Sequence, residues 1–210
     1  GYSLAAAHEA MVAGIGDYYF TNDVPLGKSG QSLFLFNDDT ALVISNSATG
    51  DATYDNTFDD VMNNQFSIMF WAKGTPPGWS PWVSKGGDGG TGWQVRPWGS
   101  NTNYPTFTIR GTGGTNTLGS GGEDLVASSF PTADGNWHLY AGTFDAFTGE
   151  RKLYVDGVLA ASEIGNVKYP SAADKHLCIG AREDVAGAPA SFSTATYFNV
   201  SVYNYAISLS

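Results

Sequence analysis

The segment from Asp134 to Ala160 constrains the fold of this chain most, because it predicts three consecutive strands joined by short turns. Apolar and aromatic residues run from Trp137 to Phe144 and again from Lys152 to Asp156, with a short turn between the two runs. A second turn at Asp156-Gly157 leads into a third run, Val158 to Ser162. Asp-Gly between two apolar runs is the strongest short-range hairpin signal, since both central residues of a type I′ turn need a positive φ. This segment therefore predicts an antiparallel sheet.

Short apolar runs alternate with turns rich in Gly, Pro and Asn along most of the chain, which is typical of an antiparallel β-sandwich. In such strands, every second side chain points to the same face of the sheet. The side chains expected to face the core are Phe66, Ile68, Phe70 and Ala72, then Trp93, Val95 and Pro97, and finally Trp137, Leu139 and Ala141.

The N-terminal residues are the exception to this strand pattern. Residues Ser3 to Val12 are rich in alanine, begin with a serine N-cap and end before Gly14, so they predict a short N-terminal helix. A length of 210 residues fits one all-β domain. We therefore expect a single domain over residues 1–210, with residues 1–16 as a helical or irregular lead-in.

Several fragments of the sequence resemble those of a known family. They are Phe66-Ser-Ile-Met-Phe-Trp-Ala-Lys73, then Trp137-His-x-x-Ala-x-Thr-Phe-Asp145 followed by Leu153-Tyr-Val-Asp-Gly157, and finally Val200-Ser-Val-Tyr-Asn-Tyr-Ala-Ile-Ser208. In their order and spacing they are similar to laminin-G-like domains, which share the concanavalin A-like lectin and glucanase jelly roll. The resemblance implies a two-sheet antiparallel β-sandwich that usually binds glycans or proteins rather than catalysing a reaction.

The sequence lacks the carboxylate pattern of the glucanases that share this fold. Retaining glycoside hydrolysis needs two carboxylates roughly 5 Å apart on one face, a spacing that alternate strand positions supply. Glu123-Asp124 and Glu183-Asp184 are adjacent pairs, so the two members of each pair point to opposite faces. The chain is therefore expected to be non-catalytic.

A polysaccharide lyase of the jelly-roll type is the main enzymatic alternative. Alginate lyases of this type use a Gln-Ile-His strand and a Tyr-Phe-Lys-Ala-Gly-x-Tyr strand, which Gln94-Val-Arg96 and Tyr197–Asn204 partly resemble. Arg96 takes the place of the histidine, and arginine cannot act as a neutral general base because its pKa exceeds roughly 12. His138 lies in a predicted strand next to Trp137, and a structural role is expected for it rather than a catalytic one.

Aromatic residues gathered between positions 79 and 104 predict a ligand-binding face. Sugar rings stack their C–H faces on aromatic side chains, while their hydroxyls need hydrogen-bond donors and acceptors. Strand alternation places Gln94, Arg96 and Trp98 on one face of a single strand. The expected ligand-binding residues are Trp79, Trp82, Gln94, Arg96, Trp98, Tyr104 and Arg110. The alternative is that Trp79 and Trp82 pack beneath the proline-rich loop.

These residues favour a non-catalytic, lectin-like module that binds a polysaccharide or glycan. The formal net charge of −10 and the pI near 4.4 argue against a nucleic-acid partner, because phosphate binding needs clustered lysines and arginines. An acidic, aromatic surface suits a neutral or cationic ligand, although acidity also keeps a secreted protein soluble. The alternative function is that of a laminin-type adhesion module, which binds proteins instead of glycans.

Cys178 is the one cysteine in the chain, so no intrachain disulfide can form, and a buried hydrophobic role is expected for it. A large sandwich can be exported without disulfides. The apolar stretch near the N-terminus contains His8 and Glu9 and is too short to span a bilayer, so no membrane insertion is expected. We expect a secreted or extracellular domain that belongs to a larger carbohydrate-active or adhesion protein.

Calcium is the structural cofactor that the resemblance implies, held by carboxylates and backbone carbonyls at a sheet edge. The candidate ligands are Asp38 and Asp39 in an early turn and Asp145 at the end of a strand. Phe198 stands where many relatives have a ligating aspartate. Turn formation is the alternative role for Asp38 and Asp39.

Overall fold

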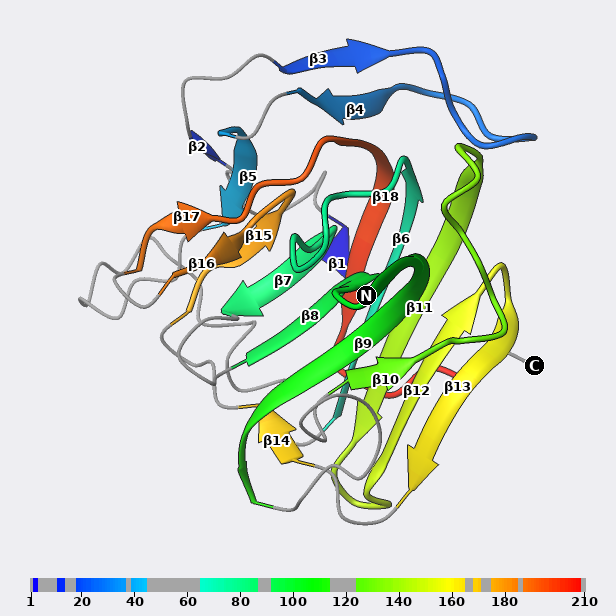
Figure 1. The fold of residues 1–210 in the computed structure, drawn as a ribbon, viewed down its shortest axis with the longest axis vertical. Coiled ribbons are helices and arrows are strands. Elements are labelled where there is room, and N and C mark those ends of the chain that lie inside the picture. Colours follow the sequence, from blue (N-terminus) through cyan, green and yellow to red (C-terminus); the bar gives the residue numbers. More distant parts are fainter. Residues whose placement is uncertain are drawn as a thin grey trace.

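The computed structural model describes residues 2–3, 11–13, 18–36, 39–44, 65–86, 92–113, 124–164, 168–170, 175–184 and 187–208. These residues form two large antiparallel sheets and one short two-stranded sheet, and no helix occurs among them (Figure 1). The predicted all-β sandwich is therefore confirmed.

The first sheet contains, in spatial order, β13 (Val158–Ile164), β12 (Glu150–Val155), β11 (Trp137–Asp145), β6 (Gln65–Lys73), β18 (Ala195–Tyr203), β4 (Ser32–Leu35) and β3 (Tyr18–Thr21), and β1 (Tyr2–Ser3) also pairs with β18. The second sheet contains β10 (Asp124–Val126), β9 (Asn101–Gly113), β8 (Gly92–Trp98), β7 (Val83–Gly86), β15 (Leu177–Ile179), β5 (Ala41–Ile44) and β2 (Met11–Ala13), and β14 (Lys168–Pro170) also pairs with β9. The short sheet pairs β16 (Arg182–Glu183) with β17 (Pro189–Ala190).

The hairpin between β12 and β13 has the predicted turn. Asp156 has φ +52° and Gly157 has φ +81°, and Val155 pairs directly with Val158 across the turn. Both central residues thus have the positive φ that a type I′ turn requires. The Asp-Gly pair fixes the register of this hairpin at the edge of the first sheet.

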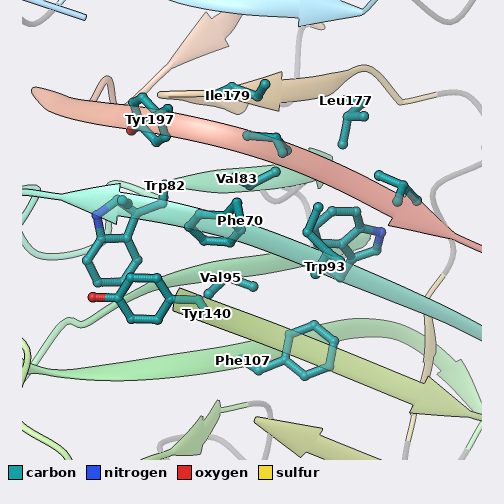
Figure 2. Packing of buried hydrophobic residues seen from close by; sticks show 14 of the residues in the cluster. Phe70, Trp82, Val83, Trp93, Val95, Phe107, Tyr140, Leu177, Ile179 and Tyr197 are labelled. Atoms are coloured by element: carbon teal, nitrogen blue, oxygen red, sulfur yellow. The ribbon is translucent and has the colours of Figure 1, made fainter. Parts of the chain in front are cut away.

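The core lies between the two large sheets and combines aromatic rings with aliphatic side chains (Figure 2). Trp82 stacks on Tyr140 with a ring-centroid distance of 4.6 Å, and Phe66 stacks on Trp93 at 5.4 Å. Offset stacking of this kind adds about 0.5–1.5 kcal/mol per pair to the free energy of burial. The rings therefore join β6 and β11 of one sheet to β8 and the segment before β7 in the other.

The predicted core faces are correct for two strands and wrong for a third. The alternate residues of β6 and the pair Trp93 and Val95 of β8 face the core, as expected. In β11, however, Tyr140 and Phe144 enter the core, whereas Trp137 and Leu139 lie on the other face and are only partly buried. Both faces of strand β11 carry large apolar side chains, so the alternation of its sequence does not show which face points to the core.

The predicted N-terminal helix is wrong at both of its ends. Ser3 belongs to β1, and Met11 and Val12 belong to β2, which pairs with β5. The remainder of the predicted helix, residues 4–10, lies outside the described residues. Helix propensity is a weak preference that pairing with a sheet edge overrides.

Candidate functional site

A row of polar side chains crosses the outward face of the second sheet. Because Trp93 and Val95 face the core, Gln94 and Arg96 point outward, as predicted. The cross-strand register joins Asp124, Thr108, Gln94, Ser84 and Cys178 into one continuous row over β10, β9, β8, β7 and β15. None of these five side chains is more than 1% exposed. This face is therefore covered, and the predicted ligand-binding strand is buried rather than open to solvent.

The positively charged side chain of Arg96 is held in one position on this face by hydrogen bonds. Its Nη2 donates to Asp124 Oδ1 at 2.7 Å and its Nη1 donates to the carbonyl oxygen of Pro97 at 3.0 Å. The Thr108 hydroxyl donates to the same Asp124 oxygen at 2.7 Å. Burial lowers the pKa of Arg96, Asp124 opposes that effect, and the charges of Arg110 and Arg182 lower the pKa further. An arginine keeps its proton under such conditions, so this face holds a rigid, desolvated guanidinium.

Several buried polar atoms on the same face have no hydrogen-bond partner among the residues that the structure describes. They are both amide atoms of Gln94, Nε of Arg96, Nε1 of Trp98 and the hydroxyl of Thr106. Thr106 pairs directly with Arg96 across β8 and β9, and it is also outward. A buried polar group without a partner costs about 1–3 kcal/mol, so a cluster of them requires an explanation such as bound water or a bound ligand.

Trp79 lies over Arg96 at the exposed edge of this cluster. The Arg96 Cζ atom is 4.6 Å from the centroid of the indole ring, and the Trp79 side chain is 43% exposed. Gly99 supports the ring on the β8–β9 turn, where an added Cβ atom would overlap the indole. Trp79 also has φ +74°, a value that costs energy for a side chain of this size. The ring is thus held in place by its neighbours.

The other predicted aromatic residues differ in their positions. Trp82 is fully buried in the core and its Nε1 donates to the carbonyl oxygen of Gly74 at 3.0 Å. This position contradicts the prediction that Trp82 stacks on a ligand, and for this residue the packing alternative is correct. Trp98 and Tyr104 are partly exposed on β8 and β9, and Arg110 is partly exposed opposite Gly92.

Sequence reasoning missed the residues that hold this cluster together. In the sequence, Asp124 is recognisable only as half of an adjacent carboxylate pair, whereas in the fold it contacts Arg96 and Thr108, and these three residues belong to three different strands. Thr106 and Thr108 could have been found by extending the alternation rule from β8 to β9. Gly99 gives no sequence signal of its contact with Trp79, because that contact depends on the conformation of two turns.

The two predicted calcium ligands that the structure describes, Asp39 and Asp145, lie at or next to strands of different sheets. Asp145 Oδ1 accepts hydrogen bonds from the backbone N–H of Phe147 at 2.8 Å and of Thr148 at 3.3 Å, in a turn at the end of β11. Asp39 precedes β5 in the other sheet and accepts a hydrogen bond from Thr40, while Asp38 lies outside the described residues. No group of three or more His, Cys, Asp or Glu side chains suited to a metal occurs among the described residues. Calcium binding stays an untested prediction.

The two lyase-like fragments lie on different sheets. Tyr197 of β18 faces the core, is 3% exposed and shares a hydrogen bond of 2.8 Å with the Ser193 hydroxyl. Burial raises the pKa of Tyr197, which opposes its ionisation as a base. Gln94 and Arg96 face outward from the second sheet, so these fragments do not form one catalytic site.

His138 is held between two carboxylates near the start of β11. Its Nδ1 lies 2.7 Å from Asp156 Oδ2 and its Nε2 lies 3.0 Å from Asp134 Oδ1. Burial lowers the pKa of His138, but the two carboxylates outweigh that effect and the net shift is upward. Hydrogen bonds from Asn136 and His138 lower the pKa of Asp134 to about 2. These contacts tie the β12–β13 turn to the strand next to it, which is a structural role.

The chain belongs to the concanavalin A-like lectin/glucanases superfamily, because the family model of that superfamily matches residues 45–210. This result confirms the family that the sequence fragments indicated. A search of curated proteins found no match. Among the described residues, no helix is long and apolar enough to cross a membrane.

Solved structures with the same fold include several binding domains. Domain 4 of AbnA, a GH43 extracellular arabinanase from Geobacillus stearothermophilus in complex with arabinotriose, is 16% identical, with a TM-score of 0.65 over 95% of this chain and 84% of that chain. The binding domain of botulinum neurotoxin DC in complex with SialylT is 13% identical, with a TM-score of 0.57 over 97% of this chain and 45% of that chain. A botulinum neurotoxin type C structure, described by its interaction with two ganglioside molecules, is 14% identical, with a TM-score of 0.60 over 97% and 45%. This chain spans less than half of the toxin chains, and at these identities the likeness establishes the fold alone.

Proposed function

We propose that this chain is a non-catalytic carbohydrate-recognition module that binds a polysaccharide or glycan at the exposed edge of β8 and β9. The observation that carries the proposal is the exposed indole ring of Trp79, which lies over Arg96 and against Gly99, next to the partly exposed Trp98. Sugar rings stack their C–H faces on aromatic side chains, and their hydroxyls both donate and accept hydrogen bonds.

The fixed position of Trp79 supports this proposal. An indole that is held by Arg96 on one face and by the Gly99 backbone loses little side-chain freedom when a ligand packs against its exposed part. Arg96 is likewise fixed by Asp124 and by the Pro97 carbonyl oxygen. A ligand would therefore meet a preformed set of groups, which reduces the entropic cost of binding.

The proposal also covers where the chain acts and which kind of protein it belongs to. We expect the chain to act outside the cell as part of a larger carbohydrate-active or adhesion protein. Support comes from structures with this fold, which include a domain of an extracellular arabinanase in complex with arabinotriose, a botulinum neurotoxin binding domain in complex with SialylT, and a botulinum neurotoxin type C described by its interaction with two ganglioside molecules. No catalytic activity is proposed, since the lyase-like fragments lie on separate sheets.

A glycan array followed by titration calorimetry tests the proposal. Trp79→Ala and Trp98→Ala should each weaken glycan binding by about tenfold or more, whereas Phe147→Ala should not. Phe147 is a matched control because it is an exposed aromatic residue in the β11–β12 turn of the other sheet. No binding to any glycan at high micromolar protein would overturn the proposal, and binding of protein partners alone would favour the adhesion module. Release of unsaturated uronate, followed by absorbance, would favour the lyase.

A further inference from the structure

Exposed apolar side chains are concentrated at the β3 edge of the first sheet. Tyr18, Tyr19 and Phe20 of β3 are 47%, 54% and 62% exposed, although each carries a large ring. Phe36, directly after β4, is 45% exposed, and Leu26 in the loop between the two strands is fully exposed. Single exposed apolar residues are ordinary, but a contiguous group of them usually marks a surface that another molecule covers. These five residues, the β3 patch, therefore form a candidate interaction surface.

The aromatic side chains of β3 lie on both of its faces. Tyr18 and Phe20 pair with core residues of β4, so they lie on the side of the first sheet that faces the second sheet. Both are nonetheless about half exposed, so the second sheet does not cover β3. Tyr19 points outward beside Phe34, with 5.0 Å between the two ring centroids. A flat ligand stacked on one face of β3 would therefore leave the other face uncovered.

The backbone of β3 is open along one side. Strand β3 is the last in the order of its sheet, and β4 is its one pairing partner among the described residues (Figure 1). The N–H and C=O groups on its other side are therefore available to another strand. Exposed edges usually contain a lysine, a proline or a bulge that prevents such pairing, but β3 reads Tyr-Tyr-Phe-Thr and pairs with β4 in an uninterrupted register. Both the side chains and the backbone of β3 thus suit the addition of a strand.

The sequence of β3 is complementary to itself in the antiparallel direction. When Tyr19 lies opposite the partner's Tyr19 on a two-fold axis, Tyr18 lies opposite the partner's Phe20, and Phe20 lies opposite the partner's Tyr18. Each of these cross-strand pairs joins two aromatic rings, a combination that stabilises antiparallel sheets. None of the three side chains is charged, so the formal net charge of −10 on each copy is not concentrated at the contact.

The β3 patch is large enough for an interface between two copies. An aromatic side chain covers about 150–250 Å² when buried, so three half-exposed rings in each of two copies supply about 600 Å². Leu26 and Phe36 extend this area, because antiparallel pairing turns the β3–β4 loop of one copy toward the partner's Phe36. With the paired backbone, the total approaches about 1,000 Å², the lower limit for a specific interface. The dimer should therefore form at micromolar rather than nanomolar concentrations.

We infer that β3 joins two copies of this chain by antiparallel pairing with the partner's β3 about a two-fold axis, so that the two first sheets become one continuous sheet. A second copy is favoured over a glycan because strand pairing covers both faces of β3 and uses its backbone, and two-fold dimers are by far the commonest soluble homo-oligomers. This contact is independent of the proposed function, since Trp79 lies between β6 and β7 and Trp98 lies in β8.

Analytical ultracentrifugation of the whole chain over a range of micromolar concentrations tests the inference. The parent should change from monomer to dimer as its concentration rises. Tyr19→Lys places two like charges opposite each other on the axis and should weaken dimerisation by at least about tenfold, which corresponds to about 1.4 kcal/mol. Phe147→Lys is the matched control, because Phe147 is 76% exposed in the β11–β12 turn, outside the β3 patch, and this variant should dimerise like the parent. Circular dichroism confirms that each variant is folded.

Hydrogen exchange distinguishes strand pairing from contacts made by side chains alone. The backbone amides of β3 should exchange more slowly at high protein concentration than at low concentration, because pairing protects them. Tyr19→Lys should remove this difference, and Phe147→Lys should retain it.

A chain that stays monomeric at high micromolar concentration would overturn the inference. A dimer that Tyr19→Lys and Phe147→Lys weaken equally, or one that leaves the exchange of β3 unchanged, would also overturn it, since the contact would then lie elsewhere. Loss of glycan binding by Tyr19→Lys in a monomeric parent would assign the β3 patch to a glycan instead. The proposed function is tested separately by Trp79→Ala, which should bind glycan more weakly and still dimerise like the parent.

Discussion

Replacing Gln94 by methionine should make the folded chain more stable. The Gln94 side chain is 1% exposed and both of its amide atoms lack a hydrogen-bond partner among the described residues. A buried, unsatisfied polar group costs about 1–3 kcal/mol, and methionine has a similar length without that cost. We therefore expect the free energy of unfolding to rise by about 1–2 kcal/mol.

Urea unfolding followed by circular dichroism measures this change. With a slope of about 2–3 kcal/mol per M, the midpoint should rise by roughly 0.5 M at an unchanged slope. Ser84→Ala is the control, because Ser84 is the buried neighbour in the same row and its hydroxyl donates to the Ala181 carbonyl oxygen at 2.8 Å. That variant should lose about 1 kcal/mol.

A lower midpoint for Gln94→Met would refute this reasoning. It would show that the Gln94 amide gains more from its surroundings than an apolar side chain does, for example through an ordered water. The buried polar cluster would then be a satisfied part of the fold.

Three further predictions follow from individual contacts. Trp82→Ala should lower the free energy of unfolding by about 3–5 kcal/mol, whereas Trp79→Ala should change it by less than about 1 kcal/mol, and similar urea midpoints for the two variants would contradict this assignment. Gly99→Ala should displace the Trp79 ring and reduce glycan affinity as much as Trp79→Ala does, and calorimetry that finds wild-type affinity would contradict the contact. Because the pKa of His138 is raised in the folded state, its contribution to stability is complete below about pH 6.5 and is lost as the pH rises through the higher folded value. His138→Gln should therefore lower the free energy of unfolding more at about pH 5.5 than at about pH 8.5, as measured by urea unfolding, and an equal loss at both pH values would contradict this.

Local rules predicted the parts of this fold that depend on neighbouring residues. The Asp156-Gly157 turn has the positive φ values that its sequence requires. The outward position of Gln94 and Arg96 follows from the period of a strand whose two faces differ in polarity. The same rule failed for β11, where Trp137 and Tyr140 are both large and aromatic and only the partner sheet determines which one is buried.

Long-range packing determined what the sequence could not predict about the candidate site. Alternation gives the face on which Gln94 lies, but it does not show whether that face is covered. The contacts that surround Gln94 come from distant segments, since Asp124 reaches Arg96 from β10 and the Ala181 carbonyl oxygen reaches Ser84 from the segment before β16. The burial of Trp82 likewise depends on Tyr140, which is far away in the sequence.

Long-range packing also explains why the net charge of the whole chain does not predict the charge near Arg96. A formal net charge of −10 describes the surface as a whole and suggests a neutral or cationic ligand. Recognition depends instead on the few charges that lie near the ligand, and burial strengthens them because the surroundings are less polar than water. Arg96, with Asp124 on one side and the Trp79 ring over it, is such a charge. Its contacts assemble only when β8, β10 and the loop before β7 come together, so the net charge of the sequence does not predict the charge beside Trp79.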